Sequence, residues 1–278
     1  MLFALCDFRN NMQEMVVIQN LRKIFNRNTI DEKVAIDGIG LEAQKGEFIT
    51  VIGSNGAGKT TLLNLIAGTY LPDEGKVFLD GRDVTHLPEH QKAKYLGRIF
   101  QNPLMGTASS MTIEENLSMA ELRGKSRGLS WGVTKKQKQR YKELLKILEL
   151  GLEERLSDRV SLLSGGQRQC LTLLMATLSL PKLLLLDEHT ASLDPKTAEK
   201  VIALTNRIVR ENELTTIMIT HNMNQAINFG DRMMMLHEGK TQFDIKGEEK
   251  KSLTVEEVVK RFGETLKDET LLCKPTEG

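Results

Sequence analysis

Residues 48–60 read FITVIGSNGAGKT, in which a run of apolar residues leads into a glycine-rich loop that ends in Lys59 and Thr60. The loop at 53–60 matches the pattern G-x-x-x-x-G-K-[ST], and the apolar sequence TLLNLIAG that follows is typical of a helix. Glycines let the backbone curl until successive N–H groups face one anion, and the positive end of the following helix points to the same place. The stretch therefore predicts a strand, a phosphate-binding loop and a helix, and with them a site for a nucleoside triphosphate.

Two residues at the end of the loop have side chains suited to different parts of a nucleotide complex. We expect Lys59 to bring a mobile cation to the outer phosphates and the Thr60 hydroxyl to ligate Mg²⁺. A chance glycine-rich turn is the alternative, and a random match in a chain of this length has a probability of about one in a hundred. The residues predicted to bind nucleotide here are Gly53, Ser54, Asn55, Gly56, Ala57, Gly58, Lys59, Thr60 and Thr61.

Polar side chains follow two further apolar runs. LLLLDE at 183–188 predicts a buried strand that ends in Asp187 and Glu188, and TTIMITH at 215–221 predicts another that ends in His221. Ligands bind at this edge of parallel sheets, so we expect Asp187 to hold Mg²⁺ and Glu188 to orient or deprotonate the attacking water. We expect His221 to hydrogen-bond the γ-phosphate or that water. A solvated turn and a structural histidine are the alternatives.

A second glycine loop stands in LLSGGQRQ at 162–169. Ser164, Gly165 and Gly166 precede an apolar helix and predict another set of open N–H groups at a helix start. A chain with one phosphate loop has no obvious use for a second phosphate cradle within itself. Asp194, in SLDP, is placed to organise a subunit contact, although by itself it is typical of a helix N-cap.

Composition limits the class of protein. The 278 residues are 40% hydrophobic and 27% charged, with a formal net charge of +1. These values indicate a soluble globular chain and argue against both a disordered chain and a strongly basic nucleic-acid binder. Three widely separated cysteines indicate a reducing compartment.

The pattern changes along the chain. Residues 1–14 read as a loose extension, and β-rich segments follow. The stretch from about 104 to 162 is polar and helix-favouring, and apolar strands then alternate with helices. Residues 247–278 form a charged tail in which Thr254 and Glu257 match a capping box, which predicts a short helix. The fold class is α/β: a P-loop NTPase core with a parallel sheet, an antiparallel β part and an inserted helical subdomain.

The ordered set of motifs from about 15 to 245 resembles the ATP-binding-cassette (ABC) ATPases, and we assign residues 15–246 to that domain. The motifs are GSNGAGKT, Gln101 in RIFQNP, LSGGQ at 163–167, LLLLDE at 183–188, SLD at 192–194 and His221. The resemblance implies that two cassettes pair head to tail. ATP is then held between the phosphate loop of one chain and Ser164, Gly165, Gly166 and Gln167 of the other.

The resemblance also assigns roles to residues outside those loops. It implies that Gln101 touches Mg²⁺ and senses the helical insertion, which docks on a membrane partner. Phe25 resembles the aromatic residue that stacks on adenine, with a core phenylalanine as the alternative. The family commonly has proline after the catalytic glutamate, whereas this chain has His189, which we expect to be a tolerated surface turn residue.

The function implied is that of an ATP-hydrolysing subunit that energises a membrane transporter, similar to cassettes of bacterial amino-acid importers. The implied cofactors are ATP and Mg²⁺. The expected partners are a second cassette that is a copy of this chain, an integral membrane permease and an extracytoplasmic substrate-binding protein, and no nucleic acid is expected. The permease would hold the chain at the cytoplasmic face of the membrane. The alternatives are the cassette of an exporter, or a soluble ABC ATPase that acts on ribosomes or DNA.

Overall fold

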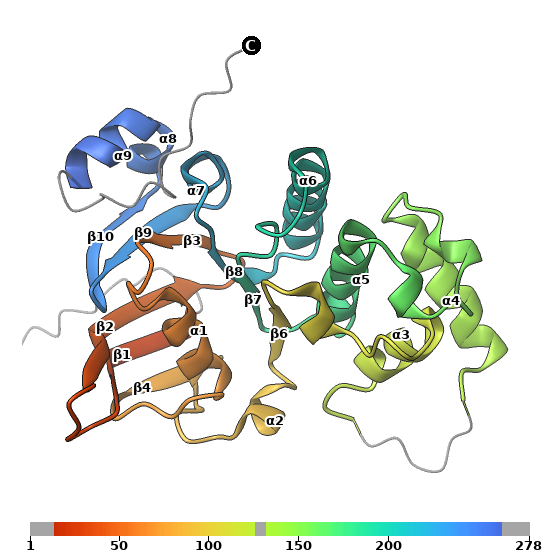
Figure 1. Cartoon of the computed structure of the whole chain (residues 1–278), viewed down its shortest axis with the longest axis horizontal. Helices are drawn as coiled ribbons and strands as arrows, with labels where there is room; N and C mark the ends of the chain where they lie inside the picture. The colour runs from red at the N-terminus through yellow and green to blue at the C-terminus, as the bar shows by residue number, and fades with distance from the viewer. Residues whose placement is uncertain (1–13, 126–131, 263–278) are drawn as a thin grey trace, which may run out of the picture.

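A six-stranded, mainly parallel sheet forms the centre of the computed structural model, which describes residues 14–125 and 132–262 (Figure 1). Strands β3, β7 and β8 are buried on both faces, as their uninterrupted apolar sequences predict. The antiparallel strand β10 closes one edge through a turn at Glu238 and Gly239. In spatial order the strands are β10 (Lys240–Lys246), β9 (Arg232–His237), β3 (Phe48–Gly53), β8 (Thr215–Ile219), β7 (Leu183–Asp187) and β6 (Leu96–Ile99).

A second sheet is antiparallel and covers helix α1 (Lys59–Ala67) from the other side. Apolar side chains of α1, such as Leu62 and Ile66, are fully buried in one core with residues of both sheets. This packing fixes the helix that follows the phosphate loop. The strands, in spatial order, are β2 (Lys33–Gln44), β1 (Glu14–Phe25), β4 (Glu74–Leu79) and β5 (Arg82–Asp83), and the short helix α2 (Glu89–Lys92) follows them.

A helical lobe extends from the opposite side of the parallel sheet, at the right of Figure 1. Helices α5 (Gly165–Thr177) and α6 (Pro195–Glu211) share one hydrophobic core with the lobe. The lobe falls in the stretch where the sequence predicts an inserted helical subdomain. It comprises the 3₁₀ turn η1 (Pro103–Gly106), α3 (Ile113–Glu121), α4 (Lys135–Lys146), and the turns η2 (Leu152–Glu154) and η3 (Val160–Leu162).

The C-terminal elements pack beside β9 and β10. Helix α7 (Met223–Asn228) follows His221, and α8 (Glu248–Lys251) and α9 (Val255–Phe262) complete the described chain. The predicted capping box is present, because the Glu257 N–H donates to Thr254 Oγ1 and the Glu257 carboxylate accepts from the Thr254 N–H.

Two of the predicted segments fall partly outside the described residues. Of the extension 1–14 the structure describes Glu14 alone, and of the tail 247–278 it describes residues 247–262. Within the described ranges, none of the helices combines the length and the apolar character needed to cross a bilayer.

Candidate nucleotide site

The phosphate loop takes its shape from glycines that the surrounding backbone would not tolerate as any other residue. Gly58 has φ +100°, and a Cβ there would lie 2.5 Å from the carbonyl oxygen of Ala35 on β2. At Gly53 a Cβ would lie 2.3 Å from the carbonyl oxygen of Leu236 on β9. No side chain caps the start of α1. The loop is therefore fixed between two sheets while the amides at the helix start face the pocket.

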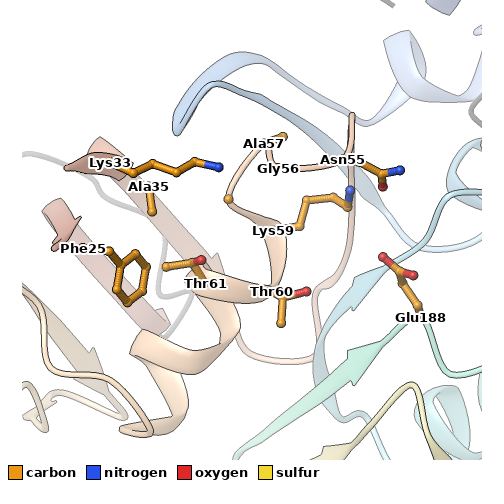
Figure 2. A pocket seen from close by; sticks show the side chains of 11 residues that line it. Phe25, Lys33, Ala35, Asn55, Gly56, Ala57, Lys59, Thr60, Thr61 and Glu188 are labelled. Carbon is orange, nitrogen blue, oxygen red and sulfur yellow. The ribbon is translucent and has the colours of Figure 1, made fainter. Parts of the chain in front are cut away.

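A pocket of about 230 Å³ opens beside this loop, and Figure 2 shows its lining. Phe25, at the end of β1, forms one wall, and its ring meets the ring of Tyr70 edge-on with 5.2 Å between centroids. Half-buried and facing the pocket, Phe25 presents an apolar surface of the kind on which a base stacks. The lining residues are Phe25, Lys33, Ala35, Asn55, Gly56, Ala57, Gly58, Lys59, Thr60, Thr61 and Glu188.

Lys59 and Thr60 lie where the phosphate loop passes into helix α1. The buried Lys59 ammonium donates to the carbonyl oxygens of Gly53 at 2.8 Å and Ser54 at 3.0 Å, which holds the cation inside the loop. The Thr60 hydroxyl donates to Asp187 Oδ1 at 3.3 Å. A hydroxyl and a carboxylate are hard oxygen donors of the kind that Mg²⁺ prefers, so this pair fits the cation of a nucleotide complex.

Asp187 sits in a strongly desolvated position at the end of β7. Burial raises the pKa of its carboxyl above the ordinary value, while the nearby Arg98 guanidinium opposes that rise. The structure thus brings Asp187 next to the phosphate loop, 127 residues away in sequence.

Glu188 and His221 form a close pair at the same sheet edge. Glu188 Oε1 lies 2.5 Å from His221 Nε2, and the Glu188 side chain, which lines the pocket, is only 10% exposed. The backbone of Glu188 is left-handed, with φ +46°, a conformation that is uncommon for a residue with a side chain and that aims the carboxylate into the pocket. His221 Nδ1 is buried, and none of the residues that the structure describes hydrogen-bonds to it. The pair provides a carboxylate with an adjacent imidazole, which is suited to general base chemistry.

The expectation for His189 is wrong. Its side chain is 2% exposed rather than at the surface, and Nε2 lies 3.1 Å from Thr205 Oγ1 on α6. Complete burial lowers the pKa of His189 to about 4, so the ring is neutral at pH 7. The reason for the error is that the chain turns inward directly after Glu188 and meets α6, which no local pattern reveals.

The LSGGQ segment does not line this pocket. Ser164 Oγ accepts from the Gln167 N–H and the Gln167 side chain accepts from the Ser164 N–H, so the two residues form a capping box at the exposed start of α5. Gly166 lies against α6, because a Cβ there would be 2.3 Å from Thr197 Cγ2. Within one described chain, this helix start and the phosphate loop are separate.

Asp194 and Gln101 are also outside the pocket. Asp194 is exposed and caps α6, where its carboxylate accepts the Thr197 N–H at 3.0 Å, and hydrogen bonds from the Thr197 hydroxyl and N–H lower its pKa. Gln101 is exposed just after β6, and its carbonyl oxygen accepts from the Ser192 hydroxyl at 3.5 Å. The N-cap interpretation of Asp194 is therefore correct for the single chain, and the roles of both residues toward nucleotide stay predictions.

Lys33 is a pocket residue that the sequence analysis did not identify. It lies at the start of β2, and Figure 2 shows its side chain extended toward Gly56. A Cβ on Gly56 would lie 3.7 Å from Lys33 Nζ. The position follows from the pairing of β1 with β2, in which Phe25 lies opposite Lys33. In the sequence, only the short separation between Lys33 and Phe25, the predicted adenine-stacking residue, pointed to a place for Lys33 in the pocket.

A parallel sheet, a phosphate loop at its edge and acidic strand ends beside that loop define a P-loop nucleoside triphosphatase. Residues 36–191 match the ABC transporter family. The chain is 44% identical over 248 residues to a tyrosine transport ATP-binding protein of Clostridioides difficile, which covers 89% of this chain and 98% of the relative. The chain therefore belongs to the ABC transporter family, as the sequence motifs predict.

Other relatives and a solved structure agree with that membership. A methionine import ATP-binding protein of Corynebacterium efficiens is 33% identical over 230 residues, and the alignment covers 81% of this chain but 61% of the relative. A dimeric ATP-binding cassette in a post-hydrolysis state, bound to ADP and Pi, has a TM-score of 0.71 and 30% identity over 84% of this chain and 98% of that one. The protein is an ATP-hydrolysing cassette subunit of a transporter, with the expected α/β fold.

Proposed function

We propose that this cassette powers the import of tyrosine or a chemically similar amino acid. The observation that supports the ATPase part most strongly is the meeting of the phosphate loop, Asp187 and the Glu188–His221 pair at one sheet edge. The substrate class rests on the tyrosine transport relative, because the alignment spans nearly all of that protein.

The nucleotide would lie along the pocket from Phe25 to the phosphate loop. Adenine stacks on the Phe25 ring, and the loop amides and the Lys59 ammonium bind the phosphates. Lys33 adds a second cation above Gly56, from the opposite side of the pocket. Two lysines on opposite walls favour a polyanion over an uncharged nucleoside.

Thr60 and Asp187, with Gln101 approaching from the end of β6, would hold Mg²⁺. The bound cation supplies charge neutralisation at the outer phosphate oxygens. Glu188 then orients the attacking water and accepts its proton, while the contact with His221 keeps the carboxylate directed into the pocket. His221, next to Glu188, would bond the γ-phosphate once the nucleotide is present.

Partners would complete the site and couple it to transport. A second copy of the chain presents Ser164, Gly165, Gly166 and Gln167 to the γ-phosphate, with Asp194 at the subunit contact. The helical lobe docks on an integral membrane permease, which places the cassette at the cytoplasmic face of the membrane. An extracytoplasmic binding protein delivers the amino acid to that permease.

Uptake of labelled tyrosine by cells that lack this gene tests the proposal. We expect the loss of high-affinity tyrosine uptake, its recovery with the intact gene, and no recovery with the Glu188→Gln variant. Methionine uptake serves as the control for substrate class. Unchanged tyrosine uptake together with impaired methionine uptake would refute the substrate assignment while leaving the ATPase in place.

A further inference from the structure

Arg98 is a charged residue in the otherwise apolar strand β6 that neither the motifs nor the proposed mechanism uses. Its side chain is only 12% exposed and lies between the phosphate-loop helix α1 and strand β7. Burial of a guanidinium is costly unless its N–H groups find partners. The contacts of Arg98 therefore show what stabilises its charge in this position.

Those contacts connect three elements. Nη2 donates to Asn64 Oδ1 at 2.6 Å, and Nη1 donates to Thr69 Oγ1 at 3.2 Å. Asn64 lies one helical turn after Thr60 on α1. The same Nη2 is 3.9 Å from Asp187 Oδ2 at the end of β7. One rigid, planar group thus ties β6 to α1 and faces the carboxylate of β7.

Asp187 is consequently held from two sides. Its Oδ1 accepts a hydrogen bond from the Thr60 hydroxyl, and its Oδ2 faces the Arg98 guanidinium. A separation of 3.9 Å is too long for a hydrogen bond, so Arg98 acts on Asp187 through charge. The attraction between buried charges is weakly screened. The carboxylate is therefore turned so that one oxygen stays with Thr60.

A purely structural role at the end of α1 is the competing explanation. A different buried cation already serves that end, because Lys92 Nζ donates to the carbonyl oxygens of Leu65 and Ile66 at 3.3 Å each. In the described structure Arg98 Nε is buried without a hydrogen-bond partner. If Arg98 served only stability, we would expect its buried Nε–H to have a hydrogen-bond partner.

We propose that Arg98 is a positioning residue for magnesium: it orients the Asp187 carboxylate beside Thr60 so that the two oxygens meet the cation of the nucleotide complex together. The inference rests on the proposed function, since it takes Thr60 and Asp187 as the magnesium ligands. Arg98 itself touches neither the cation nor the reacting atoms.

Calorimetric titration of the full chain with a non-hydrolysable ATP analogue, once with EDTA and once with Mg²⁺, tests the proposal. The wild-type chain should gain affinity when Mg²⁺ is present. In Arg98→Met we expect that gain to fall about tenfold, because groups that orient metal ligands typically contribute that much, while the affinity in EDTA stays the same. Arg98→Lys, which keeps the charge, should recover part of the gain.

Lys92→Met is the matched control, since it removes a buried cation from the same end of α1 without facing Asp187. It should lower the thermal unfolding temperature and keep the full Mg²⁺ gain. Asn64→Ala, which releases Nη2, should lose part of the gain and serves if Arg98→Met does not fold.

Three results would overturn the inference or its basis. An unchanged or larger Mg²⁺ gain in a folded Arg98→Met overturns it, as does an equal loss of affinity with and without Mg²⁺. A wild-type chain with no Mg²⁺ gain removes the proposed magnesium site itself, and the inference with it.

Discussion

Two glycine-rich segments of this chain each lead into a helix, yet the structure uses their glycines for different reasons. In the phosphate loop at 53–60, Gly56 and Gly58 are left-handed and no side chain caps α1. In the segment at 163–167 both glycines belong to α5, outside the left-handed region, and Ser164 caps the helix. The first segment needs glycine for its left-handed backbone as well as for close approach to the neighbouring strands. In the second segment Gly166 allows close approach to Thr197, and we propose that both glycines also face a second chain.

The surroundings differ in the same way. The phosphate loop lies in a pocket with an aromatic wall, two lysines and a carboxylate from the same chain. The start of α5 is exposed, and the described chain offers it no such pocket. Similar composition thus gives one site that is nearly complete in a single chain and one exposed helix start, which we propose is half of a shared site.

The largest effect should come from the carboxylate that completes the first site. Glu188→Gln keeps the size of the side chain but removes its basicity, so we expect ATP turnover to fall by at least ~10²-fold with ATP affinity retained. Phosphate release assays and calorimetry measure the two quantities. Glu238→Gln, in the nearby turn outside the pocket, should leave turnover unchanged. Near-normal turnover in Glu188→Gln would remove this residue from catalysis.

The lysine held within the phosphate loop should have the next largest effect. Lys59→Ala deletes a buried ammonium group that would donate charge-assisted hydrogen bonds to the phosphates. ATP affinity should therefore fall about 10- to 100-fold. The control is Lys240→Ala, which removes an exposed lysine paired with Asp37 beside the loop. Equal ATP affinity of the two variants in calorimetry would argue against the phosphate-loop assignment.

Alanine substitutions at Gly58 and Gly165 test directly whether the starts of the two helices differ in their need for a left-handed backbone. Gly58→Ala places a Cβ against the carbonyl oxygen of Ala35 in a left-handed position, so the free energy of unfolding should fall by at least about 1–3 kcal/mol. Gly165→Ala has room, with Leu193 Cδ2 at 3.7 Å, and should change it by less than about 0.5 kcal/mol. Urea unfolding gives both values. Comparable destabilisation by the two changes would break the comparison.

The smallest effect should come from Lys33, an exposed cation on the wall of the pocket. Lys33→Met should weaken ATP binding about threefold, more at low salt, and leave AMP binding unchanged, because solvent and salt screen this charge. Lys23→Met is the matched control, since the Lys23 ammonium is next to Phe25 but pairs with Asp73 at 3.6 Å. An equal loss for ATP and AMP would show that Lys33 does not act on the β- and γ-phosphates.

The sequence was sufficient for the parts of the site that local patterns encode. An apolar strand, a glycine loop and a helix identify residues 53–60, and apolar strands that end in Asp187, Glu188 and His221 meet at one edge because parallel strands share their carboxyl ends. The roles of these residues stay predictions, but their juxtaposition follows from the fold alone.

Residues whose surroundings come from distant packing could not be predicted in this way. Lys33 faces the phosphate loop only because the β1–β2 pairing carries it there. His189 is buried where α6 supplies Thr205 to its ring, and the Arg98 side chain reaches from β6 to Asn64 on α1. In each case a polar residue that no local pattern singles out gains its proposed role or its burial from another element.

The most direct test of a shared site is sedimentation of the Glu188→Gln chain with saturating Mg²⁺ and either ATP or ADP. We predict a dimer with ATP and a monomer with ADP, and a monomer with both when Gly165→Glu is added at the start of α5. A chain that stays monomeric with bound ATP, or a dimer that persists with Gly165→Glu, would contradict the account.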